Sequence, residues 1–112
     1  VASYYDSLLS GISNVITPGV HKNNRHVFHL YVIKAEKRDS LRDFLKEKGI
    51  STVLNYPTAL PFLKAYERLS HRPENFQNAF SNQSKILSLP IYPEISKAEI
   101  KYVADSIRIF FD

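Results

Sequence analysis

The chain has no cysteine, no methionine and no tryptophan, and only three of its 112 residues are glycine. The lack of cysteine excludes a disulfide scaffold, a thiolate zinc site and a thiol nucleophile. The three glycines stand far apart, which excludes a glycine-rich phosphate loop, and no G-x-S-x-G nucleophile motif occurs. No apolar run approaches the roughly 20 residues that span a bilayer, so we expect no membrane partner.

The charge balance is moderately basic, with a formal net charge of +4. Such a surplus favours a polyanionic partner such as nucleic acid, and a free-standing basic binding module is one reading of it. The basic residues alternate with acidic ones along the chain, however, and neither an RNA-recognition strand motif nor a G-x-x-G loop is present. We therefore expect no nucleic-acid partner.

The length is that of one domain, and 44% hydrophobic with 23% charged residues is typical of a globular protein. Because the chain begins at Val1 and contains no methionine, we expect further residues upstream of it in the natural protein.

Apolar patterning predicts two helices and three strands in the first half. The clearest strand is His26–Lys34, whose nearly continuous apolar character predicts a central strand covered on both faces. An amphipathic helix over Lys37–Lys48 follows, and Gly49 is placed to end it. The other predicted elements are a helix over residues 2–10 ended by Gly11, a strand Val15–Ile16, and a strand Ile50–Leu54 ended by Pro57.

The second half is less regular until its last helix. Thr58–Ser70 is broken by proline, an apolar stripe predicts a helix over Glu74–Leu87, and two prolines keep residues 90–93 extended. The helix Ser96–Phe111 begins with an S-x-x-E capping box. The order of elements predicts an α/β fold, an α+β sandwich in which a small antiparallel or mixed sheet packs against helices.

Two residue patterns are candidates for chemistry. His26 and His29 lie three apart in the predicted strand, where such residues point to opposite faces, so we expect no metal chelation by this pair. One of them is expected to face solvent and the other to be a hydrogen-bonded core or pocket residue, and His29 is the candidate pocket residue. Asp39, Asp43 and Glu47 lie among basic residues, which is typical of a solvated helix face.

Five segments, read in order, resemble one protein family. They are the strand HVFHLYVI, the charged helix RDSLRDFLKEKGI, the strand and loop STVLNYPTALPFLKAY, the segment KILSLPIYPEIS and the last helix EIKYVADSIRIF. Their order and spacing resemble the C-terminal small domain of the DegT/DnrJ/StrS-type nucleotide-sugar aminotransferases, over nearly the whole chain. That family usually carries an H-Y-P loop and an L-x-L-P-x-Y-P segment, and Asn55 replaces the usual histidine here.

The resemblance implies an enzyme of the aspartate-aminotransferase type, fold type I, that uses pyridoxal phosphate and works as a cytoplasmic homodimer. It implies transfer of an amino group, commonly from glutamate, to a nucleotide-linked keto-sugar, as in polysaccharide biosynthesis. The Schiff-base lysine would belong to a large domain that this chain lacks. Residues 1–112 would then be one small domain that is not catalytic alone, without catalytic, cofactor-binding or metal-binding residues.

The loop Asn55-Tyr56-Pro57 is the candidate substrate site. It leaves a predicted buried strand, and a loop held by a rigid scaffold is a common place for a binding site. By resemblance, Asn55 and Tyr56 face the sugar-nucleotide pocket, and His29 is a third candidate substrate-binding residue. Asparagine cannot titrate near neutral pH, which favours substrate positioning over proton transfer. The alternative is that Asn55 and Tyr56 are only turn and packing residues.

A second reading of the whole protein comes from the same resemblance. Some relatives of this family are thought to be non-catalytic sensors or regulators on the same fold. A lysine in the family's Schiff-base motif upstream would distinguish the enzyme from the regulator.

Overall fold

A three-stranded antiparallel sheet lies at the centre of the computed structural model, which describes all residues from 1 to 112. The strands are β1 (Val15–Ile16), β2 (Tyr31–Ala35) and β3 (Ile86–Leu89), and β2 is central. β2 and β3 are paired in a register that sets Tyr31 opposite Leu89. The predicted α/β class is confirmed, and the sheet is wholly antiparallel.

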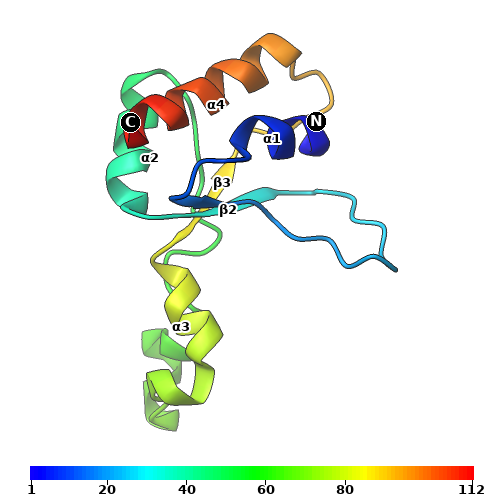
Figure 1. Cartoon of the computed structure of the whole chain (residues 1–112). Coiled ribbons are helices and arrows are strands. Elements are labelled where there is room, and N and C mark those ends of the chain that lie inside the picture. The colour runs from blue at the N-terminus through cyan, green and yellow to red at the C-terminus, as the bar shows by residue number, and fades with distance from the viewer.

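Three helices cover one face of this sheet (Figure 1). They are α1 (Ala2–Leu9), α2 (Arg38–Glu47) and α4 (Lys97–Phe111), and α4 packs against both others. The hydrophobic core lies between these helices and the sheet. Its largest fully buried side chains are Tyr5, Tyr31, Leu9, Ile33, Leu41, Leu45, Leu87, Ile100 and Ile107.

The opposite face of the sheet is not covered by helices. Side chains alternate along β2, so that Tyr31 and Ile33 are buried while Lys34 is exposed. On that open face, Ile16 is 63% exposed and Val53 is 55% exposed. The prediction that the central strand is covered on both faces is therefore wrong for this chain.

Two segments project from the body (Figure 1). Residues 17–30 form a loop between β1 and β2, and residues 54–85 form an arm between Val53 and β3. The radius of gyration is 15.3 Å, compared with about 13 Å for a compact domain of this length. The arm contains three short 3-10 helices, Leu60–Phe62, Lys64–Leu69 and Pro73–Phe76, and the helix α3 (Gln77–Gln83).

The predicted helix ends agree well with the structure. Gly11 and Gly49 follow α1 and α2 with φ of 89° and 75°, a left-handed conformation that glycine adopts without steric cost. At the start of α4, Ser96 Oγ accepts the Glu99 N–H at 3.2 Å, and Glu99 Oε2 accepts the Ser96 N–H at 2.8 Å. None of the helices is long and apolar enough to cross a membrane.

The predicted strand His26–Lys34 is too long at its start, because β2 begins only at Tyr31. A local turn replaces the ladder there: Phe28 has φ of 49°, and its N–H donates to His26 Nδ1 at 2.9 Å. β1 offers only two residues for pairing, so residues 26–30 have no strand partner. His26 and His29 therefore lie in a loop, and the strand argument about their opposite faces does not apply.

Two further predictions are corrected by tertiary pairing. The predicted strand Ile50–Leu54 is reduced to a single bridge at Val53, since Ile50 is buried in the turn that closes α2, with its N–H on the Leu45 carbonyl at 2.9 Å. The predicted helix Glu74–Leu87 ends at Gln83. Its last apolar residues belong to β3, where pairing with β2 overrides the helical periodicity.

Candidate functional site

The loop Asn55-Tyr56-Pro57 begins at the edge of the sheet, next to β3. Val53 and Ser88 exchange two backbone hydrogen bonds of 3.1 and 2.9 Å, which fix the start of the loop. Two residues further on, Asn55 Oδ1 accepts a hydrogen bond from Ser88 Oγ at 3.0 Å. The Asn55 side chain is therefore held against β3, and the residue is half-buried.

The far end of the same loop is fixed by a second contact. The backbone N–H of Ala59 donates to Gln83 Oε1 at 2.8 Å, which joins the outgoing and returning segments of the arm at its base. Tyr56 lies between the two fixed points and is 75% exposed. Two ends fixed by long-range hydrogen bonds and an exposed aromatic hydroxyl between them make this loop suited to present polar groups to a ligand.

Sequence reasoning named the loop and missed its anchors. The sequence pattern places Gln83 on the apolar stripe of the predicted helix Glu74–Leu87, and it gives Ser88 no role. Ser88 offers one signal, a polar residue between Leu87 and Leu89, whereas Gln83 lies among polar residues and offers none. Their partners lie 33 and 24 residues away.

The structure brings Asn55 and Tyr56 together but leaves His29 elsewhere. His29 is exposed and lines a shallow cavity of about 560 Å³ with Phe28, Ile91 and Tyr92. No hydrogen bond joins His29 to the loop, and β3 separates Asn55 from β2, the strand that follows His29. Substrate binding by these three residues therefore stays a prediction.

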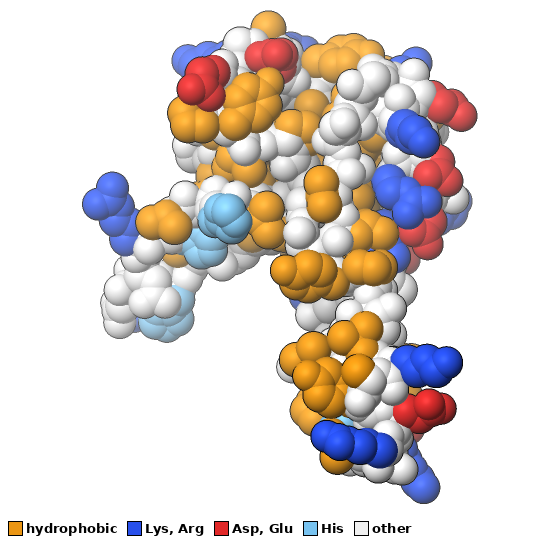
Figure 2. Space-filling model, turned by 180° about the vertical axis from the view of Figure 1, so that it is seen from behind, with side chains coloured by type: hydrophobic (Ala, Val, Ile, Leu, Met, Phe, Trp, Pro, Cys, Tyr) orange, Lys and Arg blue, Asp and Glu red, His pale blue; other side chains and the backbone are white.

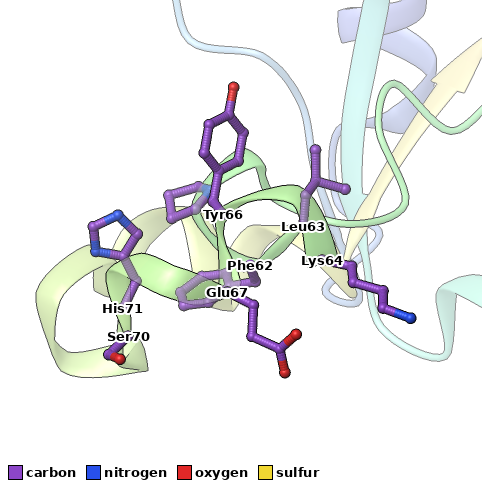
Figure 3. A pocket seen from close by; sticks show the side chains of 8 residues that line it. Phe62, Leu63, Lys64, Tyr66, Glu67, Ser70 and His71 are labelled. Carbon is purple, nitrogen blue, oxygen red and sulfur yellow. The ribbon is translucent and has the colours of Figure 1, made fainter.

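A second cavity, of about 580 Å³, lies on the arm (Figure 3). Phe62 contributes to it and also contacts Phe80 edge to face, with ring centroids 5.3 Å apart. The polar side chains around it diverge: Tyr66, Lys64 and Glu67 point in three different directions, and His71 lies apart from them. No hydrogen bond or ion pair links any of these polar groups, so the cavity contains no acid–base pair. Apolar side chains also gather on the surface of the arm (Figure 2).

Two buried tyrosines tie α1 to the rest of the fold. Tyr31 Oη donates to Asp6 Oδ1 at 2.6 Å, Tyr5 Oη donates to the Pro90 carbonyl at 2.9 Å, and the two rings stack at 4.9 Å. Burial raises the pKa of both phenols, and the hydrogen bond to Asp6 raises the pKa of Tyr31 further. Every polar end is satisfied within the chain, so the pair explains packing rather than catalysis.

The residues of this chain do not by themselves fit pyridoxal phosphate. A lysine that forms an imine must be held neutral, usually by burial, and no lysine here is buried. Lys101 and Lys85 face Asp105 and Glu36 at 2.6 and 3.6 Å. No group of three or more metal-ligating side chains exists either.

Comparison with known proteins assigns the chain to a family. Residues 1–108 match the model of the DegT/DnrJ/EryC1/StrS aminotransferase family. A pleiotropic regulatory protein of Geobacillus stearothermophilus is 37% identical over 97 residues, which are 87% of this chain and 26% of that protein. The dTDP-3-amino-3,4,6-trideoxy-alpha-D-glucose transaminase of Streptomyces venezuelae is 31% identical over 96% of this chain and 28% of its own length.

Comparison with solved structures leads to the same family. The crystal structure of a DegT DnrJ EryC1 StrS aminotransferase from Brucella abortus superposes with a TM-score of 0.87 at 33% identity, over 98% of this chain and 29% of that one. The chain thus spans less than a third of the length of the proteins it matches. With its family model, its relatives and its fold in agreement, the chain belongs to the DegT/DnrJ/EryC1/StrS aminotransferase family.

Proposed function

We propose that this chain is the C-terminal small domain of a pyridoxal-phosphate-dependent aminotransferase, which transfers an amino group, commonly from glutamate, to a nucleotide-linked keto-sugar. The observation that carries the proposal is the family match over residues 1–108, with a dTDP-sugar transaminase among the relatives. A large domain elsewhere in the same polypeptide would supply the Schiff-base lysine, since the lysines of this chain lie on its surface.

The shape of the chain supports a larger assembly. The open sheet face exposes Ile16 and Val53, and the arm exposes Leu60 and Leu69, at 50 to 63% each. Covering apolar surface of this kind removes it from water and lowers the free energy. In the proposed enzyme, the large domain of the same polypeptide and a second copy of the protein in a homodimer bury this surface.

Within that assembly, the loop at Asn55 and Tyr56 would bind and orient the substrate. Pyridoxal phosphate, held by the large domain, would supply the chemistry of amino-group transfer. The Asn55 carboxamide offers hydrogen-bond donors and an acceptor without a titrating proton, so its role is orientation. Tyr56 offers an exposed hydroxyl on the same loop, and His29 would contribute from the separate loop between β1 and β2.

A non-catalytic regulator is the second candidate function. The observation in its favour is the relative from Geobacillus stearothermophilus, which is described as a pleiotropic regulatory protein and is 37% identical to this chain. The fold and the small-domain contacts would be the same in both cases, because the lysine that distinguishes them would lie in the large domain.

The test is made on the full-length polypeptide. It is loaded with pyridoxal phosphate and incubated with glutamate and a panel of dTDP- and UDP-linked 3-keto-sugars. We expect stoichiometric formation of 2-oxoglutarate and of an amino sugar. A protein that has no lysine at the Schiff-base position and releases no 2-oxoglutarate with any substrate is the regulator instead.

A further inference from the structure

Ser88 is a buried polar residue whose hydroxyl has one partner. It lies in the middle of β3 and is 3% exposed, and its side chain is on the opposite face from Leu87 and Leu89. Its hydroxyl donates to Asn55 Oδ1 at 3.0 Å. Its backbone is bonded on the same side to Val53, so the hydroxyl has little freedom to move.

That contact fixes which end of the Asn55 carboxamide is free. A carboxamide has an acceptor oxygen at one end and an NH₂ group with two donors at the other. With Oδ1 bonded to Ser88, Nδ2 lies at the end away from that contact, and it has no hydrogen-bond partner within the chain. It is not a buried unsatisfied group, so water or a ligand can reach it.

We propose that Ser88 is a positioning residue that holds the Asn55 carboxamide so that its N–H donors face the ligand, which must present an acceptor oxygen there. This rests on the proposed function, in which the loop meets a sugar nucleotide. The acceptor is an oxygen of the keto-sugar or of the diphosphate. Ser88 acts only through Asn55 and has no contact with the ligand itself.

The first test replaces Ser88 in the full-length protein. Ser88→Ala lets the carboxamide rotate, and we expect KM for the nucleotide sugar to rise about 3- to 10-fold, the value of one hydrogen bond, with kcat held. Ser88→Thr keeps the hydroxyl, so its KM should stay near the wild-type value. Ser106→Ala is the matched control, since Ser106 is another buried serine, on α4, and its loss leaves KM unchanged.

The second test reverses the polarity of the free end. Asn55→Asp keeps an acceptor for Ser88 but turns a carboxylate towards an acceptor oxygen, and we expect KM to rise more than about tenfold because two acceptors repel. In the double variant Ser88→Ala/Asn55→Ala, the serine change adds nothing to the effect of the asparagine change. Inhibition by the free nucleoside diphosphate locates the acceptor: it weakens in Asn55→Ala if the diphosphate supplies the oxygen, and holds if the sugar does.

Three results would overturn the proposal. Full turnover by Asn55→Asp means that the free end is an acceptor, with Ser88 bonded to Nδ2. An unchanged KM in Ser88→Ala, or additive effects in the double variant, mean that Ser88 only packs; either contradicts this inference alone while the wild type remains active. A wild-type protein that neither binds nor converts any nucleotide sugar overturns both this inference and the proposed function.

Discussion

Asn55 and Tyr56 are neighbours with very different surroundings. Asn55 is half-buried and bonded to β3, whereas Tyr56 is 75% exposed and has no hydrogen bond within the chain. An exposed tyrosine hydroxyl without a partner contributes little to stability. Removing it therefore reports on binding rather than on folding.

We expect Asn55→Ala and Tyr56→Phe in the full-length protein to lower kcat/KM for the nucleotide sugar. Loss of one neutral hydrogen bond corresponds to about 0.5–1.5 kcal/mol of transition-state stabilisation. The melting temperature of Tyr56→Phe should stay at the wild-type value. If both variants keep wild-type kcat/KM, the loop residues serve only the turn and its packing.

Tyr31 makes the fold sensitive to alkaline pH. Burial raises its pKa above the value of about 10 that it has in the unfolded chain, and the Asp6 hydrogen bond adds to this. The folded state therefore favours the neutral phenol. Its contribution is fully present below about pH 10 and is lost as the pH rises above that value, because only the unfolded chain then releases the proton.

We expect the free energy of unfolding of this chain, measured by urea titration, to fall between about pH 9 and pH 11. Tyr31→Phe removes one of the two buried phenols, so its stability should decline less steeply over that range. An equal slope in the wild type and the variant would show that Tyr31 does not titrate with unfolding.

At the scale of one element, α4 depends on its first turn. Ser96 and Glu99 satisfy each other's backbone N–H groups, and the hydrogen bonds from Ser96 hold the pKa of Glu99 below its usual value. Stability from this carboxylate is present above the unfolded pKa of about 4.3 and is lost as the pH falls. The helix in turn supplies much of the core, including Ile100 and Ile107.

Ser96→Ala should destabilise the chain by about 1 kcal/mol, within a usual range of about 0.5–2 kcal/mol for a lost cap. Chemical denaturation of this variant and of Ser3→Ala measures the effect. Ser3 is an exposed serine in α1 whose side chain makes no hydrogen bond, so its change should have little effect. Equal midpoints in the two variants would show that the capping box does not stabilise α4.

For the whole molecule, the surface position of every lysine has a chemical consequence. When this chain alone is mixed with pyridoxal phosphate and reduced with borohydride, we expect only scattered, substoichiometric labelling. None of the lysines lies in a buried pocket that would favour an imine at one position over the others. One stoichiometric adduct at a single lysine, mapped by mass spectrometry, would contradict this expectation.

The net charge of +4 is also a property of the whole molecule. Arg42 forms ion pairs with Asp39 and Asp43, so basic groups are partly neutralised by their neighbours. We therefore expect no submicromolar binding to DNA or RNA at physiological salt. A tight complex with a steep dependence of log affinity on log salt concentration would reject this prediction.

The sequence by itself determined the elements whose signals are local. α2 and α4 follow from a helical apolar stripe, a capping box and a glycine placed just after the helix, because these contacts join residues at most four apart. The family could also be inferred from the sequence, since the order of the five segments can be compared without knowing how they pack.

Only the tertiary structure decided which apolar residues became strands and how the candidate site is held. Leu87 continues a helical stripe in sequence but pairs with Ile33 in the sheet, and residues 26–30 look like a strand but have no partner. The bond between Ser88 and Asn55 spans 33 residues. Strand pairing and loop anchoring depend on contacts between distant segments, and such contacts leave no periodic signal in either segment.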